Sequence, residues 1–212
     1  MRQFDLFTSQ AGLQPDAELP LSPEVLAAWQ QRVLVFQQQQ RQQPSNNAQG
    51  SLFGQHEPSE APPEPLSLPP QHLQFWRWPD SLQQGAALYF VFDHSRGDGQ
   101  ELLLYVGETC QADRRWKGEH DCKSYLAAYG EALVRCGQQP RFTIRFWCDA
   151  PAEARARRRV EQQQIRHWLP PFNKECRQRW QTPLPSDLHQ PGGTGTIARA
   201  PRRAVMHFRG SR

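Results

Sequence analysis

The chain has 212 residues, a formal net charge of +4 and a pI near 9.0. Hydrophobic residues make up 37% of it, a low share for a globular chain, and 19 prolines indicate that part of the chain lies outside any compact core. No apolar run approaches the ~20 residues needed to span a bilayer, and five cysteines without a CxxC pair favour free thiols in a reducing cytoplasm.

The N-terminal third is expected to be mostly arm and linker. Residues 1–20 are polar and interrupted by proline, which predicts a disordered arm. Residues 21–40 predict an amphipathic helix, because Ser22 can cap it and Pro23 suits its first turn. Its apolar stripe, which would pack on the following domain or dock on a partner, is expected to comprise Val25, Trp29, Val33 and Phe36. Residues 41–70 are rich in Gln and Pro and predict a linker.

Residues 72–180 hold most of the apolar side chains and predict the compact domain. Short apolar or alternating runs predict three strands, at 86–92, 101–107 and 141–148. Helices are expected at 111–118, 122–135 and 151–168. This order disfavours a parallel doubly wound sheet and predicts an α+β fold, a small three-stranded antiparallel sheet flanked by helices. Residues 181–212 predict a basic disordered tail, whose arginines either tether DNA or only solubilise the chain.

Glu161 is the most informative single position for chemistry. On the last predicted helix it shares a face with Ala154, Ile165 and Trp168, and that face is the apolar one. A carboxylate on a buried stripe is costly unless a cation neutralises it. Glu161 is therefore either the partner of a nearby arginine or a ligand of a divalent metal.

Tyr89 and Tyr105 lie on adjacent strands if residues 86–107 form a hairpin. Each could be a core aromatic with an exposed hydroxyl. Arg115 could equally be a surface charge. None of these residues identifies a function by itself.

Their combination resembles the GIY-YIG nuclease family over about residues 85–175. Ala87-Leu88-Tyr89 and Tyr105-Val106-Gly107 match the two tripeptides, and Arg115 falls ten residues after the second tyrosine, where the family has its arginine. A later block of the family resembles Glu161, Pro170, Phe172 and Asn173. The first tripeptide is ALY rather than GIY, and the loop between the tyrosines is longer than usual.

The resemblance implies hydrolysis of phosphodiester bonds. Glu161 would hold one Mg²⁺ or Mn²⁺, and Arg115 would neutralise charge on the phosphoryl oxygens. One of Tyr89 and Tyr105 would accept the proton of the attacking water, its pKa lowered from about 10 by neighbouring cations. The auxiliary residues would be Asn173, His120 and Lys117; His120 stands one residue later than the common family histidine, and Lys117 could substitute for it.

Two peptides in the N-terminal part carry large apolar residues without a core to join. The stretches QFDLF at 3–7 and QGSLF at 49–53 resemble the short peptides by which bacterial repair and replication proteins bind the sliding clamp. Such peptides insert a Leu and an aromatic residue into a pocket. The residues expected to bind are Gln3, Leu6, Phe7, Gln49, Leu52 and Phe53.

The sequence thus predicts a metal-dependent DNA endonuclease, active in DNA repair coupled to the sliding clamp and located in the cytoplasm. Two alternatives stay open. The domain could bind branched or damaged DNA and the clamp without cutting, or it could be a selfish or restriction-type nuclease of the same family. The second would normally carry its own sequence-reading module, which is not visible here.

Overall fold

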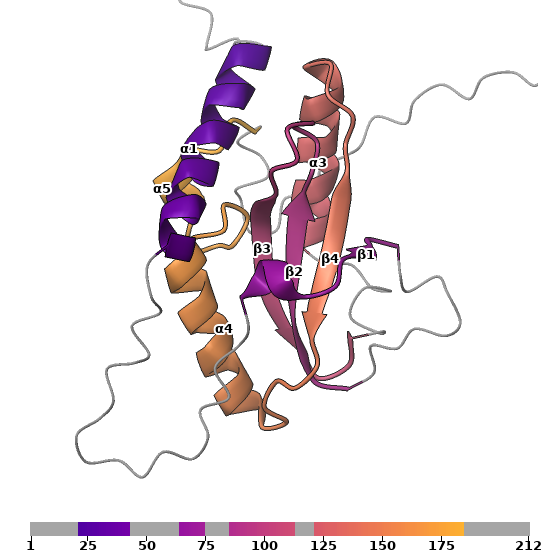
Figure 1. Ribbon diagram of the computed structural model, residues 1–212, viewed down its shortest axis with the longest axis vertical. Coiled ribbons are helices and arrows are strands. Elements are labelled where there is room, and N and C mark those ends of the chain that lie inside the picture. The colour runs from indigo at the N-terminus through magenta and orange to yellow at the C-terminus, as the bar shows by residue number, and fades with distance from the viewer. Residues whose placement is uncertain (1–20, 43–63, 75–84, 113–120, 185–212) are drawn as a thin grey trace, which may run out of the picture.

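The computed structural model describes residues 21–42, 64–74, 85–112 and 121–184 (Figure 1). Its centre is a four-stranded antiparallel sheet in the order β1-β4-β2-β3. The strands are β1 (Gln71–His72), β2 (Ala87–Asp93), β3 (Leu102–Thr109) and β4 (Phe142–Trp147). The predicted α+β class and antiparallel sheet are confirmed. The predicted count of three strands is wrong, because the two-residue β1 adds to the free edge of β4 by pairing Gln71 with Ile144.

In the described ranges five helical segments accompany the sheet: α1 (Pro23–Gln42), the 3₁₀ turn η2 (Pro65–Ser67), α3 (Asp121–Arg135), α4 (Ala154–Trp168) and α5 (Arg177–Trp180). In Figure 1, α3 lies behind the sheet, whereas α1 and α4 lie along its β3 side. In the same view the short turn η2 lies in front of the sheet, on the side away from α3. The carbonyl of Leu66 there accepts a hydrogen bond from the guanidinium of Arg145, which also pairs with Glu101.

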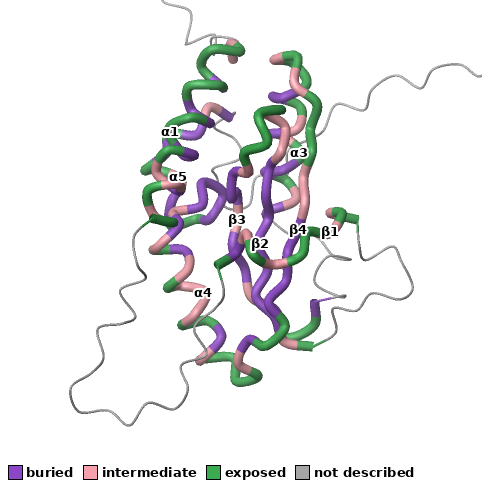
Figure 2. The backbone as a smooth tube through the Cα atoms, in the orientation of Figure 1, coloured by how far each residue is buried: buried purple, intermediate pink, exposed green. Residues whose placement is uncertain are grey.

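Both faces of the sheet are covered. All seven residues of β2 are buried, although side chains on a strand alternate between the two faces (Figure 2). The register between β2 and β3 shifts where Val91 pairs with Tyr105 and Phe92 pairs with Leu103, so one residue of β3 has no direct partner in β2. The hairpin therefore bends at mid-length.

Helix α1 packs on the domain. Its first turn is capped as predicted, since the hydroxyl of Ser22 accepts a 3.3 Å hydrogen bond from the amide of Val25. Trp29 and Val33 of the predicted stripe are buried and Phe36 is half-buried, but Val25 is 53% exposed. Its assignment to the buried stripe was wrong, because the face that meets the domain is centred on a different set. That set is Leu26, Trp29, Gln30, Val33, Leu34 and Gln37.

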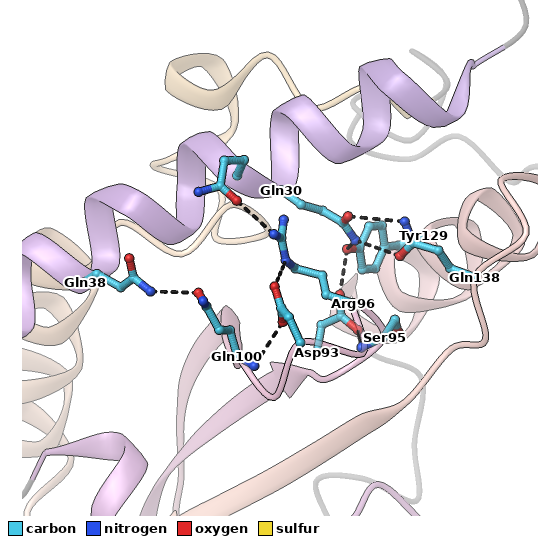
Figure 3. A network of polar contacts seen from close by, with 10 residues as sticks. Gln30, Gln38, Asp93, Ser95, Arg96, Gln100, Tyr129 and Gln138 are labelled. Carbon is cyan, nitrogen blue, oxygen red and sulfur yellow. Dashed lines mark hydrogen bonds and ion pairs between the residues drawn. The ribbon is translucent and has the colours of Figure 1, made fainter.

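Two glutamines on this buried face attach α1 to the hairpin by polar contacts. The amide nitrogen of Gln30 donates a 2.7 Å hydrogen bond to the hydroxyl of Tyr129 on α3, and that hydroxyl donates at 2.7 Å to Asp93 at the end of β2 (Figure 3). Gln37 donates to the carbonyl of Leu103 and accepts from its amide, both at 2.9 Å. Buried amides of this kind fix the position of a helix, because a shift would leave them unpaired.

The boundaries of α4 follow from local chemistry. The carboxylate of Glu153 accepts hydrogen bonds from the amides of Arg155 and Ala156, at 2.7 and 2.6 Å, and so caps the first turn. At the other end Leu169 adopts a left-handed conformation with φ of 46°, and two prolines that cannot continue a helix follow it. The helix starts three residues later than its predicted start at 151, and Ala154 is exposed rather than on the apolar face.

Packing continues beyond residue 180, because Thr182 and Leu184 are buried. Within the linker predicted at 41–70, Pro65 is buried and Glu64 forms an ion pair with Arg41 at 3.1 Å. None of the helices in the described ranges combines the length and the apolar character that crossing a bilayer requires.

Candidate active site

The site is built on the outer edge of β3. This strand pairs with β2 on one side only, so its other side presents backbone groups that need partners. The side-chain amide of Asn173 supplies two of these partners. Its oxygen accepts a 2.9 Å hydrogen bond from the backbone amide of Val106, and its nitrogen donates a 2.8 Å hydrogen bond to the backbone carbonyl of Val106. Asn173 thus takes the place of a paired strand residue. The amide of Phe172 adds a 3.0 Å bond to the carbonyl of Leu104.

Glu161 occupies the next position along this edge. Its carboxylate accepts a 3.1 Å hydrogen bond from the amide of Glu108, two residues beyond Val106. The spacing of two follows from the pleat, because alternate residues of an edge strand direct their backbone groups outward. The later block of the sequence, Glu161 with Asn173, is therefore brought to the same strand as the tyrosine motif.

Gly107 lies between these two contacts and allows the tyrosines to approach the strand. It pairs with Tyr89 across β2 and β3, and a Cβ atom added to it would overlap Cζ and the hydroxyl oxygen of Tyr89. The same atom would lie 2.9 Å from a ring carbon of Tyr105. The two tyrosine rings stack with centroids 6.0 Å apart. Tyr89 is 1% exposed, whereas Tyr105 is only partly buried.

The consecutive residues Gly107 and Glu108 therefore carry both halves of the candidate site. The hydroxyl of Tyr89 lies over Gly107, and the amide of Glu108 holds Glu161. The structure brings together Tyr89, Tyr105, Glu161 and Asn173, which the sequence placed in one site. The other expected members, Arg115, Lys117 and His120, lie outside the described residues, as do all six expected clamp-binding residues.

Burial raises the pKa of Glu161 to about 7, and the neighbouring carboxylate of Glu108 adds to the rise. The hydrogen bond from the amide of Glu108 opposes it, and Glu175 contributes a smaller increase. Within the described residues Glu161 forms no ion pair, so the alternative of a salt bridge to a described arginine is not realised. When the pKa of a carboxyl group is raised in this way, a cation that binds beside it stabilises its charged form.

The arginines nearest to Glu161 are occupied by Glu108. The guanidinium of Arg157 is 2.6 Å from the Glu108 carboxylate, and Arg158 contacts the other oxygen at 3.4 Å. Arg157 is buried and also donates to the carbonyls of Pro151 and Ala152, at 3.0 and 2.9 Å. The ion pair of Arg157 with Glu108 holds the start of α4 against β3, and the charge of Arg158 lowers the pKa of Glu161 only slightly, without forming an ion pair with it in the described residues.

The carboxyl groups fit a metal bound together with substrate better than a permanent metal site. Across the described ranges no group of three or more His, Cys, Asp or Glu side chains could enclose an ion. Mg²⁺ is commonly held by one or two carboxylates, with waters and substrate phosphates completing its shell. Glu161 suits that role, because one of its oxygens is fixed by the amide of Glu108.

Sequence reasoning missed Glu108 and Arg157. Glu108 directly follows the second tripeptide, but nothing in the sequence marks an ordinary carboxylate there as the partner of a helix. Arg157 belongs to a run of arginines, and which member turns inward depends on the position of Glu108.

Comparisons with protein families, with curated proteins and with solved structures found no match to this chain.

Proposed function

We propose that this chain is a metal-dependent endonuclease of the GIY-YIG type that hydrolyses phosphodiester bonds in DNA. The observation that carries the proposal is the convergence at Gly107 and Glu108. Two stacked tyrosines lie against the glycine, and Glu161 is held by the adjacent amide. These are residues of the two tripeptides and of the later block, which are separated by more than fifty positions in the chain.

In this proposal each residue has a separate task. Glu161 would hold Mg²⁺ or Mn²⁺, which when bound polarises the scissile phosphate and stabilises the leaving oxygen. Tyr105, the more exposed tyrosine, accepts the proton of the attacking water, and Tyr89 fixes its ring by stacking. Arg115 neutralises the charge that grows on the phosphoryl oxygens. Asn173 holds the edge of β3 at Val106, two residues before the position that contacts Glu161.

The test is cleavage of a panel of linear, nicked, flapped, mismatched and four-way DNA by the purified full-length protein. We expect cutting of at least one substrate with Mg²⁺ or Mn²⁺ and none in EDTA. Glu161→Ala and Arg115→Ala should each lose activity by about 10²-fold or more. The matched control is Glu131→Ala, an exposed carboxylate on α3, which should retain activity.

Full activity in Glu161→Ala would exclude this carboxylate as the metal ligand. Tight binding of one substrate without any cleavage would favour the non-catalytic alternative, in which the domain only recognises DNA structure.

Recruitment to the sliding clamp is the second part of the proposal. It rests on the apolar pairs Leu6–Phe7 and Leu52–Phe53, each of which lies in a segment rich in polar residues. Each peptide alone should bind in the micromolar range, and two peptides carried on one chain can gain avidity on a ring with repeated pockets. Calorimetry with purified clamp should show binding that Leu6→Ala with Phe7→Ala weakens strongly and that the four-residue change abolishes. Absence of binding at tens of micromolar would contradict recruitment.

A further inference from the structure

Helix α4 carries an unusual concentration of positive charge beside the candidate site. It contains five arginines and one carboxylate, Glu161. Arg157 is buried in its pair with Glu108, whereas the other four arginines are exposed. We call these four the α4 arginine face: Arg155, Arg158, Arg159 and Arg166.

Helical periodicity places the members of this face together. Arg155, Arg159 and Arg166 are spaced by four and seven residues and therefore follow one side of the helix, and Arg158 lies between that side and Glu161. Arg155 and Arg166 are separated by about 16 Å along the axis at 1.5 Å per residue. A DNA strand presents one phosphate per 3.4 Å of its axis, so the face matches a run of about five phosphates.

Apart from Glu161, the carboxylates that contact this helix already have hydrogen-bond or ion-pair partners. Glu153 accepts hydrogen bonds from the backbone amides of the second and third residues of α4, and Glu175 accepts a 3.2 Å hydrogen bond from Gln162. Glu108 is shared between Arg157 and Arg158. With the carboxylates of the described residues, Arg155, Arg159 and Arg166 form no ion pair within 4 Å. Their charge is thus available to an external anion.

Like charges one turn apart destabilise a helix, and Arg155 and Arg159 have this spacing. A solubilising surface would be equally served by a mixture of signs. The exposed face instead has one sign, and it lies on the helix that positions Glu161. A continuous polyanion that reaches the candidate site is the partner whose charge complements it.

We propose that the α4 arginine face is the docking surface for the sugar-phosphate backbone of the DNA substrate. This inference rests on the proposed nuclease function and adds where the strand lies. Arg158, next to Glu161, contacts the phosphates nearest to the cut, and Arg155, Arg159 and Arg166 hold the backbone further along. The contacts are electrostatic and independent of sequence, so they supply affinity and register but no choice of bases.

The experiment compares two triple variants that lose the same charge. Arg155→Gln with Arg159→Gln and Arg166→Gln removes the outer part of the face and leaves Arg157 and Arg158 in contact with Glu108. The control, Arg32→Gln with Arg135→Gln and Arg141→Gln, changes three exposed arginines outside α4. Binding of a fluorescent 30-base-pair nicked duplex to the full-length protein is measured in EDTA at 50–200 mM salt. Thermal melting verifies that both variants fold.

The α4 variant should bind on the order of tenfold or more weakly, and the slope of log K against log salt should fall by about 0.9 for each phosphate that the variant no longer neutralises. The control should keep an affinity and slope close to the wild-type values. Equal reductions of affinity in both variants would overturn the inference, because only net charge would matter. An α4 variant that binds like wild type, while Glu161→Ala abolishes cleavage, would overturn the docking surface and leave the nuclease intact. If the wild-type protein cuts none of the DNA substrates and the α4 variant still binds DNA more weakly than wild type, the docking surface is supported and the nuclease proposal is refuted.

Discussion

The carboxylate of Glu161 lies 3.1 Å from the backbone nitrogen of Glu108, so the middle of α4 is fastened to the edge of β3 at the residue after Gly107. The hydroxyl of Tyr89 lies over that glycine from the neighbouring strand. A displacement of β3 at this point therefore moves the tyrosines and the carboxylate relative to each other. Among the described glycines, Gly107 is the one at which an added Cβ atom would overlap its neighbours.

Gly107→Ala should disturb both tyrosines. Its new methyl group would overlap the ring and hydroxyl of Tyr89, and both neighbours are held in the sheet. We expect a loss of about 1–3 kcal/mol in the free energy of unfolding, which is the usual cost of overpacking. Urea denaturation gives the stability, and cleavage assays should show a loss of activity larger than the loss of folded protein.

Gly130→Ala is the matched control. Gly130 lies inside α3, where a Cβ would meet its nearest neighbour, a ring carbon of Phe142, at an ordinary 3.7 Å. Alanine should raise stability by up to about 1 kcal/mol, since glycine is the poorer helix former. If both substitutions destabilise equally, the close approach at Gly107 has no special role.

Much of the fold could be predicted because its signals are local. The three main strands lie within two residues of the expected bounds, since apolar runs ended by turn residues are visible without tertiary information. The two-residue β1 was missed for the converse reason. Gln71 and His72 have no apolar periodicity of their own, and they are extended because the edge of β4 offers them partners.

The candidate site could be predicted only in part. The position of Glu161 among buried residues follows from helical spacing, but its partner depends on how α4 lies against β3. One member of the predicted α1 stripe was wrong: Val25 is exposed and its neighbour Leu26 is buried instead, because a helix face is wide enough for either to fit the spacing. The burial of Arg157 in a run of arginines depends on Glu108, which is far away in sequence.

The two tyrosines should contribute unequally to catalysis. Tyr89 is almost completely buried, whereas Tyr105 remains partly accessible to a water molecule. Tyr105→Phe should therefore lower kcat by about 10²–10⁴-fold, the usual contribution of a general base. Tyr89→Phe keeps the stacked ring and should lower kcat less. Single-turnover cleavage by the two variants measures the difference, and a larger loss in Tyr89→Phe would reverse the assignment.

Asn173→Ala should destabilise the edge of β3. The substitution leaves the amide and the carbonyl of Val106 without their partners, and each buried unpaired group costs about 1–3 kcal/mol. We expect a loss of about 2–5 kcal/mol in the free energy of unfolding, measured by urea denaturation. The control is Lys174→Ala, an exposed neighbour whose replacement should change stability by less than about 0.5 kcal/mol. Similar small effects of both changes would show that water can replace the Asn173 amide.

Asp93 should make stability depend on pH in the direction opposite to an ordinary surface carboxylate. It is 1% exposed, and burial raises its pKa although Ser95 and Tyr129 donate hydrogen bonds to it and His94 lies beside it. The unfolded chain releases the proton at about pH 3.9, and the folded chain releases it at higher pH. Between these two pKa values the folded state binds more protons, so the stability contributed by Asp93 falls as pH rises.

Asp93→Asn removes this titration. The free energy of unfolding of the variant, relative to wild type, should therefore increase as the pH rises from about 4 through the folded pKa of Asp93. Urea denaturation from about pH 2.5 to about pH 8 covers the titration of both aspartates and measures this difference, and the trend is independent of the constant effect of altering the hydrogen bonds. Asp98→Asn provides the opposite control: slight burial raises the pKa of Asp98, but hydrogen bonds from Gln100 and Arg96 outweigh it and lower the pKa overall. Wild type should gain stability over the Asp98 variant as pH rises through the unfolded pKa. A constant difference between wild type and Asp93→Asn across the whole range would mean that Asp93 is ionised in the folded protein as readily as in the unfolded chain.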